Sequence, residues 1–227
     1  MTMPYYVSPE QLMKDRADFA RKGIARGRSV VVVTCRDGIV LATANPSRVL
    51  HKVSEIYDRI AFAGVGKYNE FENLRVAGVR YADLRGYSYD RADVRARGLA
   101  NAYAQTLGSV FTNEAKPLEV EIVVAEVGAT PHDDQLYRVS FDGSVTDETG
   151  VVVVGGDADR AATGLQEAWD PAAPLGAALR SAVDVLSGDE RLTATDLEVG
   201  LLERAQPGRA FRRVGEAELA SLLTDAS

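Results

Sequence analysis

The stretch of sequence that decides the fold is Ser29-Val-Val-Val-Val-Thr-Cys-Arg-Asp-Gly-Ile-Val-Leu-Ala-Thr43. Two apolar, β-branched runs, Val30 to Thr34 and Ile39 to Thr43, flank the turn residues Arg36-Asp37-Gly38. A glycine-containing turn between two such runs is typical of a β-hairpin. The pattern predicts a pair of antiparallel strands inside a sheet.

Composition limits the class of protein. The chain has 227 residues, of which 46% are hydrophobic, enough for a sizeable core. Its net charge of −7 argues against nucleic acid or an anionic membrane as the principal partner. The single cysteine, Cys35, excludes an intramolecular disulfide and suits a reducing compartment. Apolar runs are strand-sized, and the first residues lack a signal-peptide pattern, so we expect a cytoplasmic protein with no membrane segment.

A helix is expected directly before the hairpin. Ser8 is an N-cap candidate, Pro9 stands at the first helical position, and Gln11 completes a Ser-x-x-Gln capping box. Apolar or small residues then recur at helical spacing, and Gly27 is a plausible stop. The positions that recur are Leu12, Arg16, Phe19, Ala20, Gly23 and Ile24, and they give the helix more apolar surface than a small flanking helix needs.

Strand and helix patterns alternate in blocks along the rest of the chain. Strands are predicted at residues 60–66, 118–127, 136–141, 151–154, 197–203 and 210–214. Helices are predicted at residues 67–82, 90–111 (capped by Asp90), 157–169, 175–186 and 216–223. Two antiparallel sheets stacked face to face, with helices on both outer sides, would bury every amphipathic face. The fold class is therefore α+β, a four-layer αββα sandwich with an extra N-terminal helix.

Motifs for independent chemistry are weak. Gly64-Val-Gly66-Lys67 fails as a phosphate loop, because Ala61 replaces its first glycine and Tyr68 its Ser or Thr. Close packing of a helix on the strand explains these glycines better. Gly155-Gly156 reads as a strand-to-helix turn rather than a dinucleotide site. His51, His132 and Cys35 are too scattered to predict a metal site, and no cofactor is expected.

Several longer stretches carry a resemblance to a known family. They are Tyr5-Tyr-Val-Ser-Pro-Glu-Gln, Ala20-Arg-Lys-Gly-Ile-Ala-Arg-Gly, Glu55-Ile-Tyr-Asp-Arg-Ile, Gly66-Lys-Tyr-Asn-Glu-Phe-Glu-Asn-Leu-Arg, Arg85-Gly-Tyr-Ser-Tyr-Asp-Arg, Leu99-Ala-Asn-Ala-Tyr-Ala-Gln-Thr-Leu-Gly and Ala210-Phe-Arg-Arg-Val. With these stretches the chain resembles actinobacterial 20S proteasome α subunits over essentially its whole length. The resemblance implies the N-terminal nucleophile hydrolase fold, in residues 9–227 as a single domain.

The resemblance also implies a function and partners. α-Type subunits form a homo-heptameric ring that flanks rings of catalytic β subunits, admits tagged protein substrates and docks a hexameric ATPase. The catalytic subunits of that family begin at the hairpin with a threonine, whose free amine activates its hydroxyl. Here Arg28 and Ser29 stand at that point and residues precede them, so no catalytic residue is expected.

Two sites follow from the family. Lys52 is expected to bind the activator's C-terminal carboxylate, with Gly66 leaving room for the activator's backbone. By default, a lone lysine is a solvated surface group. A gate peptide is expected over residues 1–8: Met1, Thr2, Met3, Pro4, Tyr5, Tyr6, Val7 and Ser8.

Two rival functions remain open from the sequence. An N-terminal-nucleophile peptidase would have to remove residues 1–28 as a propeptide and expose Ser29, although a capped amphipathic helix is an unusual design for a propeptide. A stand-alone small-molecule binding domain has no motif in its favour. The mass of the intact chain tests the first rival, and the mass of the particle in solution tests the second.

Overall fold

The computed structural model describes residues 8–156, 158–188 and 192–224. Its strands are β1 Val30–Cys35, β2 Gly38–Ala44, β3 Val53–Tyr57, β4 Ile60–Gly66, β5 Val120–Glu126, β6 Gln135–Val139, β7 Val145–Glu148, β8 Val151–Val154, β9 Leu197–Glu203 and β10 Phe211–Arg213. Its α-helices are α1 Pro9–Ala25, α2 Tyr68–Ser88, α3 Ala96–Asn113, α4 Ala158–Ala168, α5 Leu175–Ser187 and α6 Glu216–Thr224. Short 3-10 turns lie at Arg91–Asp93, Pro131–Asp133 and Ala194–Asp196.

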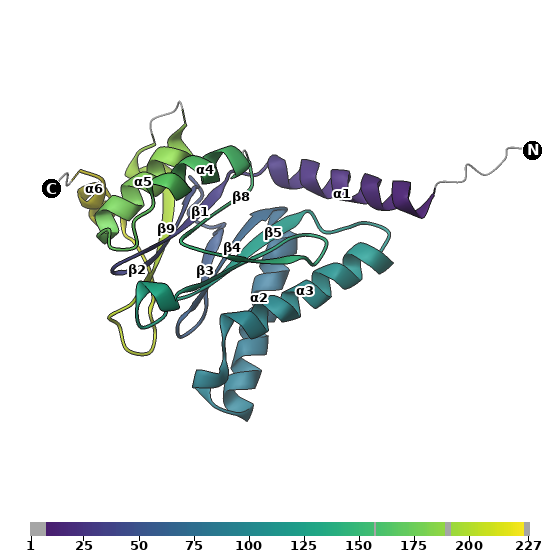
Figure 1. The fold of residues 1–227 in the computed structure, drawn as a ribbon, viewed down its shortest axis with the longest axis horizontal. Helices are drawn as coiled ribbons and strands as arrows, with labels where there is room; N and C mark the ends of the chain where they lie inside the picture. Colours follow the sequence, from purple (N-terminus) through teal and green to yellow (C-terminus); the bar gives the residue numbers. More distant parts are fainter. Residues whose placement is uncertain (1–7, 157, 189–191, 225–227) are drawn as a thin grey trace, which may run out of the picture.

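The strands form two antiparallel sheets that face each other. One sheet has the order β10-β9-β2-β1-β8 and the other the order β3-β4-β5-β6-β7. Helices α4 and α5 cover the outer face of the first sheet, and α2 and α3 cover the outer face of the second (Figure 1). The predicted αββα sandwich is confirmed.

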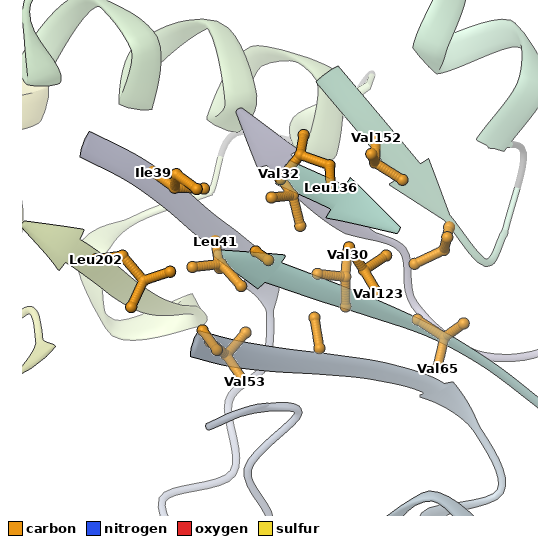
Figure 2. Packing of buried hydrophobic residues seen from close by; sticks show 14 of the residues in the cluster. Val30, Val32, Ile39, Leu41, Val53, Val65, Val123, Leu136, Val152 and Leu202 are labelled. Atoms are coloured by element: carbon orange, nitrogen blue, oxygen red, sulfur yellow. The ribbon is translucent and has the colours of Figure 1, made fainter. Parts of the chain in front are cut away.

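The core has three layers, one between the sheets and one beneath each pair of helices. Val30 and Val32 of β1 point into the layer between the sheets, where they meet Val123 of the opposite sheet (Figure 2). Val31 and Val33 point the other way, toward α4 and α5. Because the strand is covered on both sides, it is apolar throughout rather than alternating.

The hairpin that decided the prediction is present with the expected turn. β1 pairs with β2 from Val30↔Thr43 to Cys35↔Gly38, and Arg36 and Asp37 form the turn. Gly38 has a φ of +150°, and a Cβ there would lie 1.9 Å from the carbonyl oxygen of Leu202. The glycine is therefore required where β2 approaches β9.

Helix α1 starts as predicted and leaves part of its apolar surface exposed. Ser8 accepts from the backbone N–H of Gln11 at 3.2 Å, which is the serine half of the expected capping box. Ala20 and Ile24 are buried, whereas Leu12 is 48% and Phe19 is 47% exposed. The helix packs against β4 and β5 with its C-terminal half and runs outward from there (Figure 1).

The prediction of one helix from residue 90 to residue 111 is wrong. Asp90 caps only the short turn Arg91–Asp93, by accepting from Ala92 N at 2.8 Å, and the chain is then extended at Arg95. Helix α3 begins at Ala96, whose N–H donates to Glu126 Oε2 at 2.7 Å. The start of the helix is thus fixed by a carboxylate at the end of β5 rather than by its own flanking sequence.

Candidate functional site

The segment that joins α1 to β1, residues 26–29, forms one side of the candidate site. The nitrogen of Ser29 is a peptide nitrogen, and its hydroxyl donates to the carbonyl oxygen of Gly155 at 2.9 Å. The carbonyl oxygen of Ser29 accepts from the Thr43 hydroxyl at 2.7 Å. Because the hydroxyl proton is given to a carbonyl, Ser29 does not face a general base, and its environment is that of a structural residue.

Lys52, which directly precedes β3, lies against this segment. Its half-buried side chain donates from Nζ to the carbonyl oxygen of Arg28 at 2.7 Å. Burial lowers the pKa of Lys52 to about 8, the positive charge of Arg28 contributes to the decrease, and the negative charge of Glu198 opposes it. The ammonium is still mostly charged at pH 7, and an anion placed beside it would stabilise that charge.

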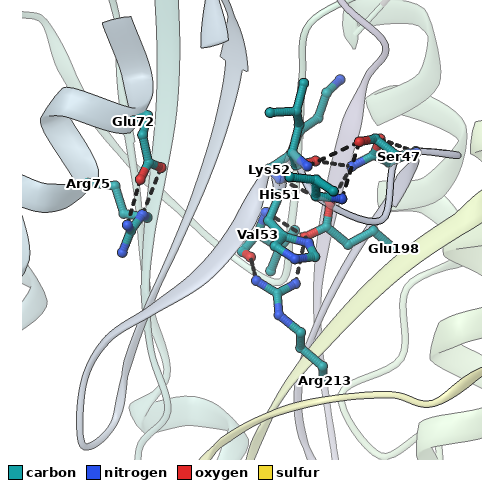
Figure 3. Close-up of polar contacts among 11 residues, drawn as sticks. Ser47, His51, Lys52, Val53, Glu72, Arg75, Glu198 and Arg213 are labelled. Atoms are coloured by element: carbon teal, nitrogen blue, oxygen red, sulfur yellow. Dashed lines mark hydrogen bonds and ion pairs between the residues drawn. The ribbon is translucent and has the colours of Figure 1, made fainter. Parts of the chain in front are cut away.

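A buried carboxylate holds the loop that carries Lys52. Glu198 on β9 is 8% exposed and accepts hydrogen bonds from the backbone N–H groups of Lys52, at 3.0 Å, and Val53, at 3.2 Å. It also accepts from two side chains, Asn45 Nδ2 at 2.7 Å and Arg213 Nη1 at 2.6 Å, and His51 Nδ1 lies 3.2 Å from the carboxylate without a hydrogen bond. Figure 3 shows His51, Lys52, Val53 and Arg213 around the Glu198 carboxylate. Lys52 is therefore held in a fixed position.

Gly66 lies at the same corner of the molecule as Lys52. The N–H of Gly64 donates to the carbonyl oxygen of Lys52 at 2.9 Å, and Gly66 is two residues further along β4. A Cβ on Gly27 would lie 3.3 Å from the nitrogen of Gly66, so the turn after α1 also reaches this point. The structure thus brings together the two residues that the sequence singled out.

The reason for a glycine at position 66 lies within the chain. Its φ is +100°, and a Cβ there would lie 1.9 Å from the carbonyl oxygen of Glu119. Gly64 is also constrained, though less strongly, because a Cβ there would lie 2.9 Å from the Phe71 ring of α2. Close packing of a strand, its neighbour and a helix accounts for both glycines, as expected when the phosphate-loop interpretation was set aside.

The comparison with protein families fits this geometry. A family model described as "Proteasome subunit" matches residues 24–199. The chain belongs to the proteasome subunit family. Three relatives are called "Proteasome subunit alpha": a protein of Sanguibacter keddieii is 68% identical (98% of this chain, 90% of the relative), one of Xylanimonas cellulosilytica 66% (96% and 95%), and one of Kineococcus radiotolerans 60% (98% and 98%).

Within the proteasome family, this chain has the non-catalytic role of the α ring. The environment of Ser29 agrees with that role, because helix α1 precedes it and its hydroxyl donates to a backbone carbonyl. The prediction that the chain resembles actinobacterial α subunits is confirmed.

The sequence does not predict two residues that hold Lys52 in place. Glu198, which anchors the Lys52 loop, follows a short turn in a polar stretch and carries no motif. Arg28 was noted only as the neighbour of Ser29, although its carbonyl oxygen holds the Lys52 ammonium. The position of Arg28, two residues before β1, is the one local signal that could have identified it.

The predicted gate peptide falls mostly outside the described residues. Residues 1–7 are not among them, and Ser8 is the N-cap of α1. No described helix is both long and apolar enough to cross a membrane. Across residues 8–156, 158–188 and 192–224, no group of three or more His, Cys, Asp or Glu side chains is arranged to hold a metal ion.

Proposed function

We propose that this subunit forms a homo-heptameric α ring in the cytoplasm, stacked on β-subunit rings that hold the active sites. The ring admits tagged proteins through a gate formed by residues 1–8, with residues 9–227 as a single α-type domain. A hexameric ATPase docks on it by inserting its C-terminal tails beside Lys52 and Gly66.

The observation that supports docking most directly is the state of the Lys52 ammonium. A lysine ammonium has three N–H donors, and the structure assigns one of them to the carbonyl oxygen of Arg28. None of the described residues places a carboxylate within ion-pair distance of Nζ, because Glu198 binds the Lys52 backbone instead. A fixed, half-buried cation with donors to spare suits an incoming carboxylate.

Exposed apolar side chains support assembly into rings. Leu12 and Phe19 on α1 are about half exposed, on a helix that runs outward from the sheets (Figure 1). At the far end of α2 and just beyond it, Leu84 is 69%, Tyr87 is 92% and Tyr89 is 74% exposed. Exposed apolar groups gathered in this way are typical of surfaces that partners cover. We assign α1 to the neighbouring copy of this chain and the end of α2 to a β subunit.

The docking proposal is tested with Lys52→Ala in the assembled α–β particle. Loss of the ammonium should cost about 2–5 kcal/mol of tail binding, or well over tenfold in affinity. Assembly should be unchanged, because Glu198 holds the loop through the backbone of Lys52 and not its side chain. Isothermal titration with a peptide of the ATPase's last ten residues measures the affinity.

Lys67→Ala is the matched control. Lys67 lies at the same corner, directly after Gly66, but its ammonium is 3.7 Å from Glu70 and therefore has a carboxylate partner. The Lys67→Ala particle should bind the peptide with the same affinity as the parent particle. Equal affinities of the parent and Lys52→Ala particles would show that Lys52 is an ordinary surface lysine and that tails dock elsewhere.

A further inference from the structure

Arg28 is a second cation at the docking corner, and its guanidinium has no hydrogen-bonded or ion-paired partner among the described residues. Its side chain is exposed and makes no hydrogen bond or ion pair with any residue that the structure describes. Most neighbouring charges are already compensated: Lys67 is paired with Glu70, Arg75 with Glu72 and Arg213 with Glu198. The absence of a partner therefore distinguishes Arg28 from these other cations.

Arg28 and Lys52 are close enough for their charges to interact. The backbone carbonyl of Arg28 accepts the hydrogen bond from Lys52 Nζ at 2.7 Å, which holds the Lys52 ammonium against the Arg28 backbone. The positive charge of Arg28 is one of the causes that lower the pKa of Lys52. Two cations held near each other repel, and an anion that contacts both removes the repulsion and gains two attractions.

The space beside Arg28 is open to a ligand. Arg28 and Ser29 line a cavity of about 390 Å³, with Asp196 also in its lining. The Asp196 carboxylate accepts from the Thr193 hydroxyl at 2.6 Å and from the Thr193 N–H at 3.0 Å. These bonds lower the pKa of Asp196, and the positive charge of Arg28 adds to the decrease without a direct ion pair. The rest of the lining is apolar, from Ala44, Pro46, Ala161, Val185, Leu186 and Leu192. Lys52 does not line this cavity, but the Arg28 backbone, whose carbonyl oxygen accepts from the Lys52 ammonium, joins the cavity to Lys52.

We propose that Arg28 and Lys52 hold the same terminal carboxylate of the activator tail, with the guanidinium of Arg28 as the second cation. This inference rests on the docking function proposed above. A planar guanidinium can donate two parallel N–H groups to one carboxylate, whereas the ammonium of Lys52 acts as a point charge. Arg28 thus strengthens the preference for a free carboxylate over a neutral chain end.

The test measures tail binding to the assembled α–β particle at two salt concentrations. The probes are a ten-residue peptide from the C-terminus of the ATPase and the same peptide with a C-terminal carboxamide. The variants are Arg28→Ala, Arg28→Lys, Lys52→Ala and the control Arg26→Ala. Arg26 is an exposed arginine two residues away that does not line the cavity. Arg26→Ala therefore changes the net charge by the same amount as Arg28→Ala without changing the cavity.

We expect Arg28→Ala to weaken binding of the free-acid peptide by roughly fivefold to twentyfold. Arg28→Lys should restore part of that loss, and Arg26→Ala should bind within about twofold of the parent. The carboxamide peptide should bind weakly to every variant and lose little further on Arg28→Ala. Removing Arg28 should also raise the pH at which the free-acid peptide loses affinity, because a cation that repels the Lys52 proton is gone.

The outcomes separate this inference from the docking proposal. If Lys52→Ala abolishes binding while Arg28→Ala binds like the parent, docking stands and the role of Arg28 is refuted. Equal losses for Arg28→Ala and Arg26→Ala would mean a general effect of net charge and would also refute it. If the carboxamide binds as tightly as the free acid, the docking proposal itself fails, and this inference fails with it.

Discussion

At the residue scale, Lys52 shows how one side chain can be both structurally fixed and chemically available. Its backbone N–H is held by Glu198 and its ammonium touches the carbonyl oxygen of Arg28. Burial lowers its pKa to about 8, which places the titration of a lysine close to physiological pH. The protonated form is the one that can bind a carboxylate.

Tail docking should therefore depend on pH. Binding a carboxylate favours the protonated lysine, so the pKa of Lys52 is higher in the complex than in the free particle. Affinity should be flat below about pH 7 and fall above about pH 8, by up to about tenfold per pH unit. Peptide titrations from pH 6 to pH 9.5 measure this. Arg28 and Glu198 are the other charged groups that act on the ammonium.

A Lys52→Arg particle is the control for that profile. An arginine stays charged over the whole range, so whatever affinity it retains should not change with pH. A parent particle whose affinity is constant to pH 9.5 would mean that no proton on Lys52 is needed for docking.

At the element scale, helix α3 shows a start that is fixed by a distant residue. Glu126, at the end of β5, accepts from Ala96 N at 2.7 Å and from Arg95 Nε at 2.6 Å. It is 8% exposed, so its carboxylate depends on these donors. The same contacts end the extended segment after Arg91–Asp93 and set where α3 lies on the sheet.

Glu126→Gln should destabilise the subunit. The neutral amide loses the charge-assisted bond to Arg95, and its N–H₂ group faces the N–H donor of Arg95 or Ala96. The free energy of unfolding should fall by about 1–3 kcal/mol. Thermal and urea unfolding of the isolated subunit measure the change. Glu114→Gln, the same substitution at the exposed C-terminal end of α3, should unfold like the parent. Equal stability of Glu126→Gln and the parent would show that the cap contributes nothing.

At the scale of the whole molecule, the exposed apolar groups indicate a subunit whose surface is partly covered by other subunits. The two sheets and their helices bury a complete three-layer core without help from a partner. Phe19 and Leu12 nevertheless remain on the surface of α1. Ring closure in a cyclic assembly needs two complementary patches on each copy, and α1 supplies one of them in our proposal.

Phe19→Ser should impair assembly without unfolding the subunit. The Phe19 ring is 47% exposed, so its loss should barely change the melting temperature of the isolated chain. When the variant is mixed with the β partner, the four-ring cylinder and its peptidase activity should be reduced. Native mass measurements, electron microscopy and peptide turnover check this. The control Lys14→Ser, at an exposed polar position of α1, should assemble normally. Normal assembly of Phe19→Ser would show that α1 is not part of the interface.

The gate proposal predicts the behaviour of a truncated chain. A particle whose α subunits lack residues 1–7 should degrade peptides faster than the parent, because the truncation speeds peptide entry and leaves the cleavage step unchanged. Ser8 is retained so that α1 keeps its N-cap. The α subunit alone should hydrolyse no peptide in either form. Turnover that is the same in both particles would argue that residues 1–7 do not obstruct entry.

Local patterns by themselves determined most of the fold. The strands at residues 60–66, 151–154 and 197–203 have the predicted bounds, and the hairpin has the predicted turn. Turn chemistry, strand-length apolar runs and a helix cap are encoded within a few neighbouring residues, so they can be recognised without the structure. The family, and with it the interest of Lys52 and Gly66, also followed from continuous stretches of sequence.

Only the tertiary structure decided how the corner is built and where α3 begins. Glu198 lies 146 residues from the Lys52 N–H that it accepts, and Glu126 lies 30 residues from the helix start that it caps. A glycine is required at position 66 because of the carbonyl oxygen of Glu119, which directly precedes the neighbouring strand β5. No local sequence pattern connects these two residues. Such buried partners are chosen by which strands become neighbours, since a desolvated carboxylate or carbonyl pairs with whatever group the fold places beside it.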